Sequence, residues 1–134
     1  MALVPGCAGG VNGARQGLAN AALVQAKIYK TLVNYDATMQ KNIVDEAIAK
    51  GHLDEGTFQL AEYRGKRKIA LEALQYSSGA TLAAEAALAI GARAKTGDKD
   101  AMGWIAEVAT AMVRVYQALE ALGWKRIGLG GIMP

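Results

Sequence analysis

Apolar residues recur at helical spacing in three stretches of the chain. The first stretch, residues 18–50, carries them at steps of three and four: Ile28, Leu32, Tyr35, Met39 and Ile43. This spacing places their side chains on one face of an α-helix. Lys50 lies in the expected last turn, and Gly51 follows at a position where a left-handed C-cap is common. The pattern predicts a helix over residues 18–50.

A second helix is predicted over about residues 54–95. Asp54, Glu55 and Thr57 suit its first turn, because side-chain oxygens and negative charge are favourable at a helix N-terminus. A helix of roughly 40 residues is about 60 Å long, which exceeds the size of a compact domain of this mass. We expect a kink near Gly79, and either the helix breaks or the molecule is elongated.

The third predicted helix, residues 98–123, has the clearest amphipathic pattern in the chain. Gly97 can end the preceding helix, Asp98 or Asp100 can cap the next one, and Gly123 can close it. We expect its apolar stripe to form an interface. The residues assigned to this interface are Ile105, Met112, Tyr116 and Leu119.

Two glycine-rich segments flank the helical part. Residues 1–17 and 124–134 contain many glycines and no acidic residue, a composition that disfavours an isolated helix and is typical of an arm. The chain also has only 2 prolines and 1 phenylalanine, which favours helix over sheet. The predicted fold is all-α: an elongated three-helix hairpin or bundle, one domain over residues 18–123, with glycine-rich N-terminal and C-terminal arms.

Composition excludes several classes of function. With one cysteine, Cys7, and one histidine, His52, the chain cannot form an internal disulfide or a Cys/His zinc site. The N-terminus lacks the basic and apolar segments of a secretory signal. The sequence carries no phosphate-binding loop and no nucleophile beside a base. We therefore expect no catalytic residue, no cofactor and no bound metal.

A basic cluster is the first candidate binding feature. Arg64, Lys66, Arg67 and Lys68 place four positive charges within five residues, in a chain whose net charge is +3. A helix distributes these side chains around its circumference, so we call them the basic collar. The collar could contact nucleic acid or acidic lipid. The simpler interpretation is a solvated face that pairs with nearby glutamates.

A row of small residues is the second candidate feature. Gly79, Ala83, Ala87 and Gly91 recur every four residues, and we call them the small-residue ridge. Small side chains let another helix approach closely, in water or in lipid. The ridge lies in residues 73–91, where Glu85 is the only charge. Tight helix packing is the favoured interpretation. Insertion into a membrane as part of an oligomer is the alternative.

The general plan of the chain resembles a known group of proteins. An Ala- and Gly-rich segment, Gly17-Leu18-Ala19-Asn20-Ala21-Ala22-Leu23-Val24-Gln25-Ala26-Lys27, feeds a long helix, and further Ala-rich helices and a glycine-rich tail follow. This plan resembles the small internal virion proteins of short-tailed bacteriophages. The resemblance implies a non-enzymatic protein that is held inside the capsid and expelled with the genome. It also implies assembly with other virion proteins into a conduit across the host envelope.

The residues themselves favour self-assembly. A short helical chain with 52% hydrophobic and 20% charged residues has more apolar surface than one small core buries. We therefore expect a homo-oligomer. The resemblance implies in addition that it is a virion structural protein, and contact with a membrane and contact with nucleic acid are further expectations. Two alternatives remain open at this point: a small helical adaptor that docks on one protein partner through its third helix, and a basic DNA-associated packaging protein.

Overall fold

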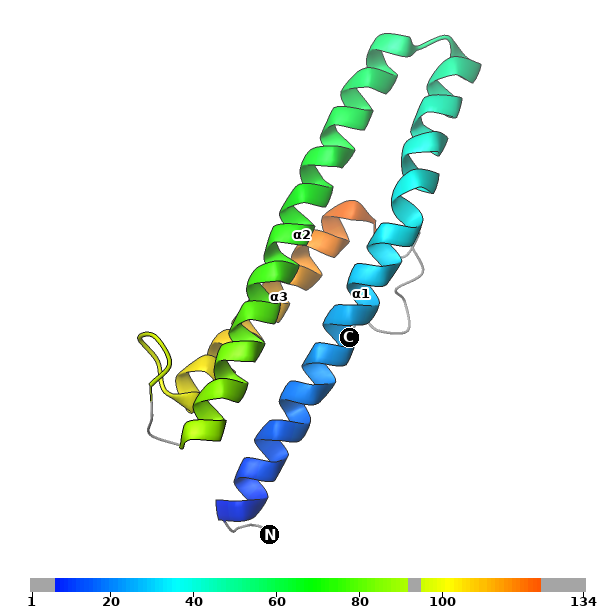
Figure 1. Ribbon diagram of the computed structural model, residues 1–134. Coiled ribbons are helices and arrows are strands. Elements are labelled where there is room, and N and C mark those ends of the chain that lie inside the picture. Colours follow the sequence, from blue (N-terminus) through cyan, green and yellow to red (C-terminus); the bar gives the residue numbers. More distant parts are fainter. Residues whose placement is uncertain (1–6, 92–94, 124–134) are drawn as a thin grey trace.

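The computed structural model describes residues 7–91 and 95–123, which form three α-helices (Figure 1). Helix α1 spans Cys7–Lys50, α2 spans Leu53–Ile90 and α3 spans Ala101–Leu122. No strand occurs among the described residues. The predicted all-α, three-helix fold is confirmed.

The start of α1 differs from the prediction. Cys7 begins the helix, so residues 7–17 are helical although they were expected to be part of the N-terminal arm. The side chain of Leu18 is 3% exposed and anchors the helix by packing. Extending an anchored helix avoids the cost of nucleation, so glycines such as Gly13 and Gly17 are tolerated in it. Residues 1–6 and the predicted tail, 124–134, lie outside the described residues.

A tight turn joins α1 and α2 into an antiparallel hairpin. Gly51 has φ of 69°, its N–H donates to the carbonyl of Ile48 at 3.1 Å, and the N–H of His52 donates to the carbonyl of Ala47 at 2.9 Å. These bonds satisfy carbonyls at the end of α1, and a positive φ is easiest for glycine. The predicted stop at Gly51 is confirmed.

Helix α2 ends earlier than predicted, at Ile90, with Gly91 at its C-cap. The helix continues through Gly79 without interruption, so the expected alternative of an elongated molecule applies (Figure 1). Helix α3 then begins at Ala101, because the Asp100 carboxylate accepts a hydrogen bond from the N–H of Gly103 at 2.9 Å and caps the first turn.

Helix α3 packs mainly on α2 and covers only part of the hairpin. Figure 1 shows α3 running antiparallel to α2 along the half of the hairpin that contains the α2 C-terminus, while the α1–α2 turn extends well beyond it. The core lies where the three helices meet. Its largest fully buried side chains are Ile28, Leu119, Val115, Thr81 and Ser77.

The apolar interface predicted on the third helix is used inside the chain. Met112 is 8% exposed and Leu119 is fully buried, while Ile105 and Tyr116 pack against the same core. These four side chains hold α3 on the hairpin, so they are not free to bind a partner. The prediction identified an interface correctly, but the interface joins α3 to its own chain because a hairpin of two helices leaves an apolar seam that a third helix covers.

Candidate binding groove

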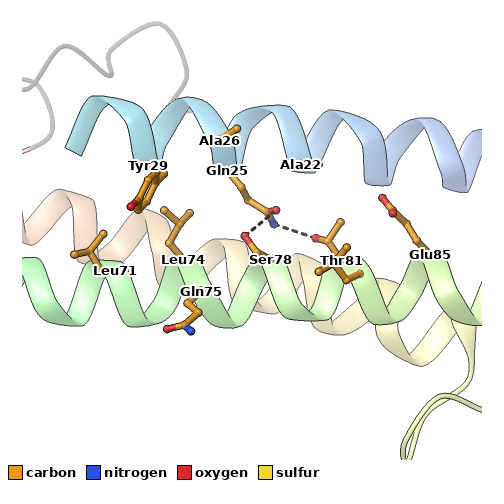
Figure 2. Close-up of a pocket in the computed structure, with 11 residues that line it drawn as sticks. Ala22, Gln25, Ala26, Tyr29, Leu71, Leu74, Gln75, Ser78, Thr81 and Glu85 are labelled. Atoms are coloured by element: carbon orange, nitrogen blue, oxygen red, sulfur yellow. Dashed lines mark hydrogen bonds between the residues drawn. The ribbon is translucent and has the colours of Figure 1, made fainter. Parts of the chain in front are cut away.

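A groove of about 610 Å³ runs between α1 and α2. It faces the viewer in Figure 2, with α3 behind the two helices. Its lining is mostly apolar, with a few polar side chains along α2. The lining residues are Ala22, Gln25, Ala26, Tyr29, Leu71, Leu74, Gln75, Ser78, Thr81, Leu82 and Glu85.

A buried glutamine forms the floor of this groove. Gln25, which is 5% exposed, donates from Nε2 to Oγ1 of Thr81 at 3.0 Å and to Sδ of Met112 at 3.6 Å. Its Oε1 accepts a hydrogen bond from the hydroxyl of Ser78 at 3.3 Å (Figure 2). One side chain of α1 thereby contacts α2 and α3 together. Because buried polar groups need partners, these bonds favour one register of the three helices.

Apolar side chains form the rims of the groove and are left uncovered. Leu82 is 67% exposed and Tyr29 is 56% exposed, and they lie on opposite helices. Glu85 contributes the one charged side chain of the lining. A surface of this kind is suited to an apolar helix or chain segment, since uncovered apolar area favours burial.

Among residues 7–91 and 95–123, no group of three or more His, Cys, Asp or Glu side chains could hold a metal ion. No helix in the same ranges is sufficiently long and apolar to cross a bilayer. Four polar residues of segment 73–91, for which membrane insertion was the alternative, line the groove: Gln75, Ser78, Thr81 and Glu85. No family model, curated protein or solved structure matches the chain.

The second set of polar contacts lies further along the hairpin, around Asp36. Its Oδ1 pairs with Nη1 of Arg67 and accepts a hydrogen bond from the Tyr63 hydroxyl at 3.1 Å, and its Oδ2 accepts one from Gln40 at 3.0 Å. Burial opposes ionisation of Asp36, but these hydrogen bonds and the Arg67 charge lower its pKa. Burial and the Asp36 hydrogen bond raise the pKa of Tyr63 to about 12. The cluster therefore joins α1 to α2 with the Asp36 carboxyl group ionised.

These contacts occupy most of the basic collar. The Arg64 guanidinium donates to Oε1 of Gln40 at 3.0 and 2.9 Å, Lys66 lies 3.8 Å from Glu62, and Arg67 pairs with Asp36. Lys68 is exposed. Three of the four collar residues thus contact side chains of their own chain. Lys66 lies near a glutamate of the same helix, as the simpler interpretation expected, whereas Arg64 and Arg67 contact residues of α1. Nucleic-acid or lipid contact stays a prediction.

The small-residue ridge is divided between solvent and the core. A Cβ on Gly79 would meet nothing within 4 Å, Ala83 is half-buried and Ala87 is fully buried. An α-helix has 3.6 residues per turn, so a spacing of four drifts by about 40° at each step. The ridge therefore winds around α2 from the solvent side at Gly79 to the packed side at Ala87. It does not form one continuous interface inside the chain, and its packing against another molecule stays a prediction.

Helix α2 packs inside the chain through a different row. This row mixes steps of three and four, which keeps it on one face. Its buried members are Ala70, Leu74, Ser77, Ala80, Ala84 and Ala87. Small side chains let a helix approach closely here, and Ala87 is the one residue that this row shares with the ridge.

Sequence reasoning assigned no role to Gln25 or Asp36. Their partners, Thr81 and Arg67, belong to another helix and lie far away along the chain. A polar residue on an otherwise apolar helix face is a weak signal of such a contact. Gln25 carries this signal, because it precedes Ile28 and Leu32 by three and seven residues on the same face.

The Asp36 contacts predict a specific acid dependence of stability. The pKa of Asp36 is lower in the folded chain than its ordinary value of 3.8, so its contribution is present above about pH 3.8 and is lost as the pH falls through the lowered pKa. We expect Asp36→Asn to lower the free energy of unfolding by about 1 kcal/mol at pH 7, and the difference from wild type to shrink towards pH 3. Urea denaturation at pH 7, 5 and 3 measures this difference.

Asp45→Asn is the matched control. Asp45 lies on the same helix, and its ion pair with Lys41 is exposed on both sides, so its removal changes stability little at any of these pH values. A difference between wild type and Asp36→Asn that is the same at pH 7 and pH 3 would contradict an ionised Asp36 contact.

Proposed function

We propose that this protein is a non-enzymatic structural protein that assembles with copies of itself. The observation that supports this most is the apolar surface that three helices leave uncovered. The groove between α1 and α2 has exposed apolar rims at Tyr29 and Leu82, and α3 exposes Met102 and Val113 on its other side. Apolar surface of this extent favours burial against another molecule.

A structural role also agrees with how the polar residues are used. Gln25 joins the three helices, and Asp36, Tyr63 and Arg67 join α1 to α2. These side chains have partners that orient the helices. Their role in the chain is to hold one helix in position on another.

The narrower proposal is that the protein is an internal virion protein of a short-tailed bacteriophage. It is supported by the resemblance of the chain's plan to such proteins. In this role, copies expelled with the genome would line up to form part of a conduit through the host envelope, together with other virion proteins. A narrow, elongated helical subunit suits the wall of such a conduit, because the long helices of several copies can lie side by side along the axis of the conduit (Figure 1).

Light scattering of the purified full-length chain tests both levels of the proposal. A discrete multimer of the 14.0 kDa chain is the expected result for self-assembly. Formation or enlargement of that multimer on anionic phospholipid vesicles is expected for the conduit. A mass near 14.0 kDa at all concentrations, with and without vesicles, would contradict self-assembly. A multimer whose mass does not change when vesicles are added would contradict the conduit proposal but not self-assembly.

A further inference from the structure

The outer face of α3 is a second apolar surface, separate from the side that packs in the core. Its residues recur at steps of three and four, are all exposed and carry no charge. Met102 is 67% exposed and Val113 is 53% exposed. We call this surface the outer stripe. It consists of the apolar residues Met102, Ala106, Ala109 and Val113 and ends at Gln117, which is polar but uncharged. A helix that is apolar on two faces normally buries both.

We propose that the outer stripe of one copy occupies the α1–α2 groove of a second copy. This inference rests on the proposed self-assembly and names the two surfaces that carry it. The docked α3 of the first copy would pack against α1 and α2 of the second copy, on the side opposite that copy's own α3. The hairpin and the two α3 helices would then form a four-helix arrangement.

Apart from Glu85, which is exposed at one end of the groove, the lining carries no charge and matches an uncharged helix face. Its polar floor is already satisfied, because Gln25 bonds to Ser78, Thr81 and Met112. An apolar face can therefore cover the floor without leaving a buried donor or acceptor unpaired. The rims then gain burial of exposed apolar area on Tyr29 and Leu82.

Charges at the ends of the two surfaces specify a direction. Lys68 is exposed and lies one turn before Leu71, which lines the groove, while Glu120 is exposed and lies one turn after Gln117 at the end of the outer stripe. With the docked α3 antiparallel to α2, Glu120 of one copy meets Lys68 of the other. Leu82 follows Lys68 by 14 residues on α2, and Ala106 precedes Glu120 by 14 residues on α3. In this antiparallel register, Ala106 of one copy therefore meets Leu82 of the other.

The two surfaces lie on opposite sides of the molecule, since α3 is behind the helix pair whose groove faces the viewer in Figure 2. Each copy consequently contacts one neighbour through its groove and another neighbour through its outer stripe. A contact between two different surfaces repeats from copy to copy and produces a ring when the rotation closes or a filament when it does not.

Mixing two variants tests this arrangement. Val113→Arg places a charge on the outer stripe and Leu82→Arg places one on the groove rim. Each variant alone is expected to be a monomer of about 14.0 kDa by light scattering. An equimolar mixture is expected to show twice that mass and no more, because each variant retains the surface that the other has lost. Val44→Arg and Leu53→Arg change exposed residues at the hairpin end and are expected to retain the wild-type mass.

The outcomes separate the inference from the proposed function. A wild-type chain that is monomeric overturns both. If the wild-type chain is a multimer and Val113→Arg or Leu82→Arg remains a multimer, the inference is overturned but self-assembly is not. The same holds if only Val44→Arg or Leu53→Arg dissociates the multimer. A mixture that stays at 14.0 kDa overturns the contact between unlike surfaces. If circular dichroism shows that either variant has lost its helices, Ala106→Arg and Gln75→Arg replace it at exposed positions of the same two surfaces.

Discussion

Leu119→Ala is expected to lower the free energy of unfolding by about 2–5 kcal/mol, the usual range for removing a fully buried leucine side chain. Leu119 is 0% exposed and belongs to the same core cluster as Ile28 and Val115. The core is narrow because α3 covers only part of the hairpin (Figure 1). Neighbouring helices are held along their length, so they cannot fully collapse into the cavity that the truncation leaves. Urea denaturation followed by circular dichroism measures the loss.

The same experiment distinguishes two roles for the apolar stripe of α3. If Leu119 served mainly to bind a partner, its truncation would change binding and leave the stability of the isolated chain nearly intact. Leu23→Ala is the matched control, since Leu23 is 71% exposed and its truncation is expected to change stability by no more than about 0.5 kcal/mol. Equal, small effects of the two substitutions would contradict the core position of Leu119.

Gly56→Ala is expected to destabilise the end of the hairpin, although alanine is the better helix former. A Cβ on Gly56 would overlap with Cβ of Ala47, because it would lie closer than two non-bonded carbon atoms can approach. The two helices must therefore separate near the turn. Overpacking of this kind costs about 1–3 kcal/mol, and the gain in helix propensity offsets up to about 1 kcal/mol. We expect a lower midpoint in urea denaturation than for wild type.

Two further variants identify the clash as the cause. A Cβ on Gly65, in the same helix, would meet nothing within 4 Å, so Gly65→Ala is expected to stabilise the chain by about 0.5–1 kcal/mol. Removing the opposing methyl group with Ala47→Gly is expected to relieve part of the Gly56→Ala defect, which a double-mutant cycle would show as a favourable coupling. Stabilisation by Gly56→Ala equal to that by Gly65→Ala would show that α1 and α2 do not approach closely at this point.

Local signals in the sequence were sufficient for most helix ends. Gly51, Asp100 and Gly123 act in the structure as the sequence predicted, because a cap depends on residues within one turn of itself. The exceptions were the N-terminal arm and the C-terminus of α2, which ends at Ile90 rather than near Gly97. Glycine content argued against a helix in residues 7–17, but attachment to the packed part of α1 outweighs the propensity of single residues.

The candidate surfaces were harder to predict. The apolar stripe with Met112 and Leu119 was evident from its periodicity, but periodicity does not say whether a face is covered by the same chain or by another molecule. The small-residue ridge does not lie on one packed face of the chain, since its spacing of four residues drifts around α2 from Gly79 to Ala87. The groove could not be located at all, because it is formed by residues of α1 and α2 that are distant along the chain.

The sequence by itself determined the helical fold, the order of the three helices and the turn at Gly51, since these depend on spacing and caps within a few residues. Only the tertiary structure decided which apolar faces remain uncovered. Placing α3 on one side of the hairpin buries Leu119 in the chain and leaves the opposite groove, with Tyr29 and Leu82, open. Burial is a property of all neighbours in space, and a linear pattern contains only the neighbours along the chain.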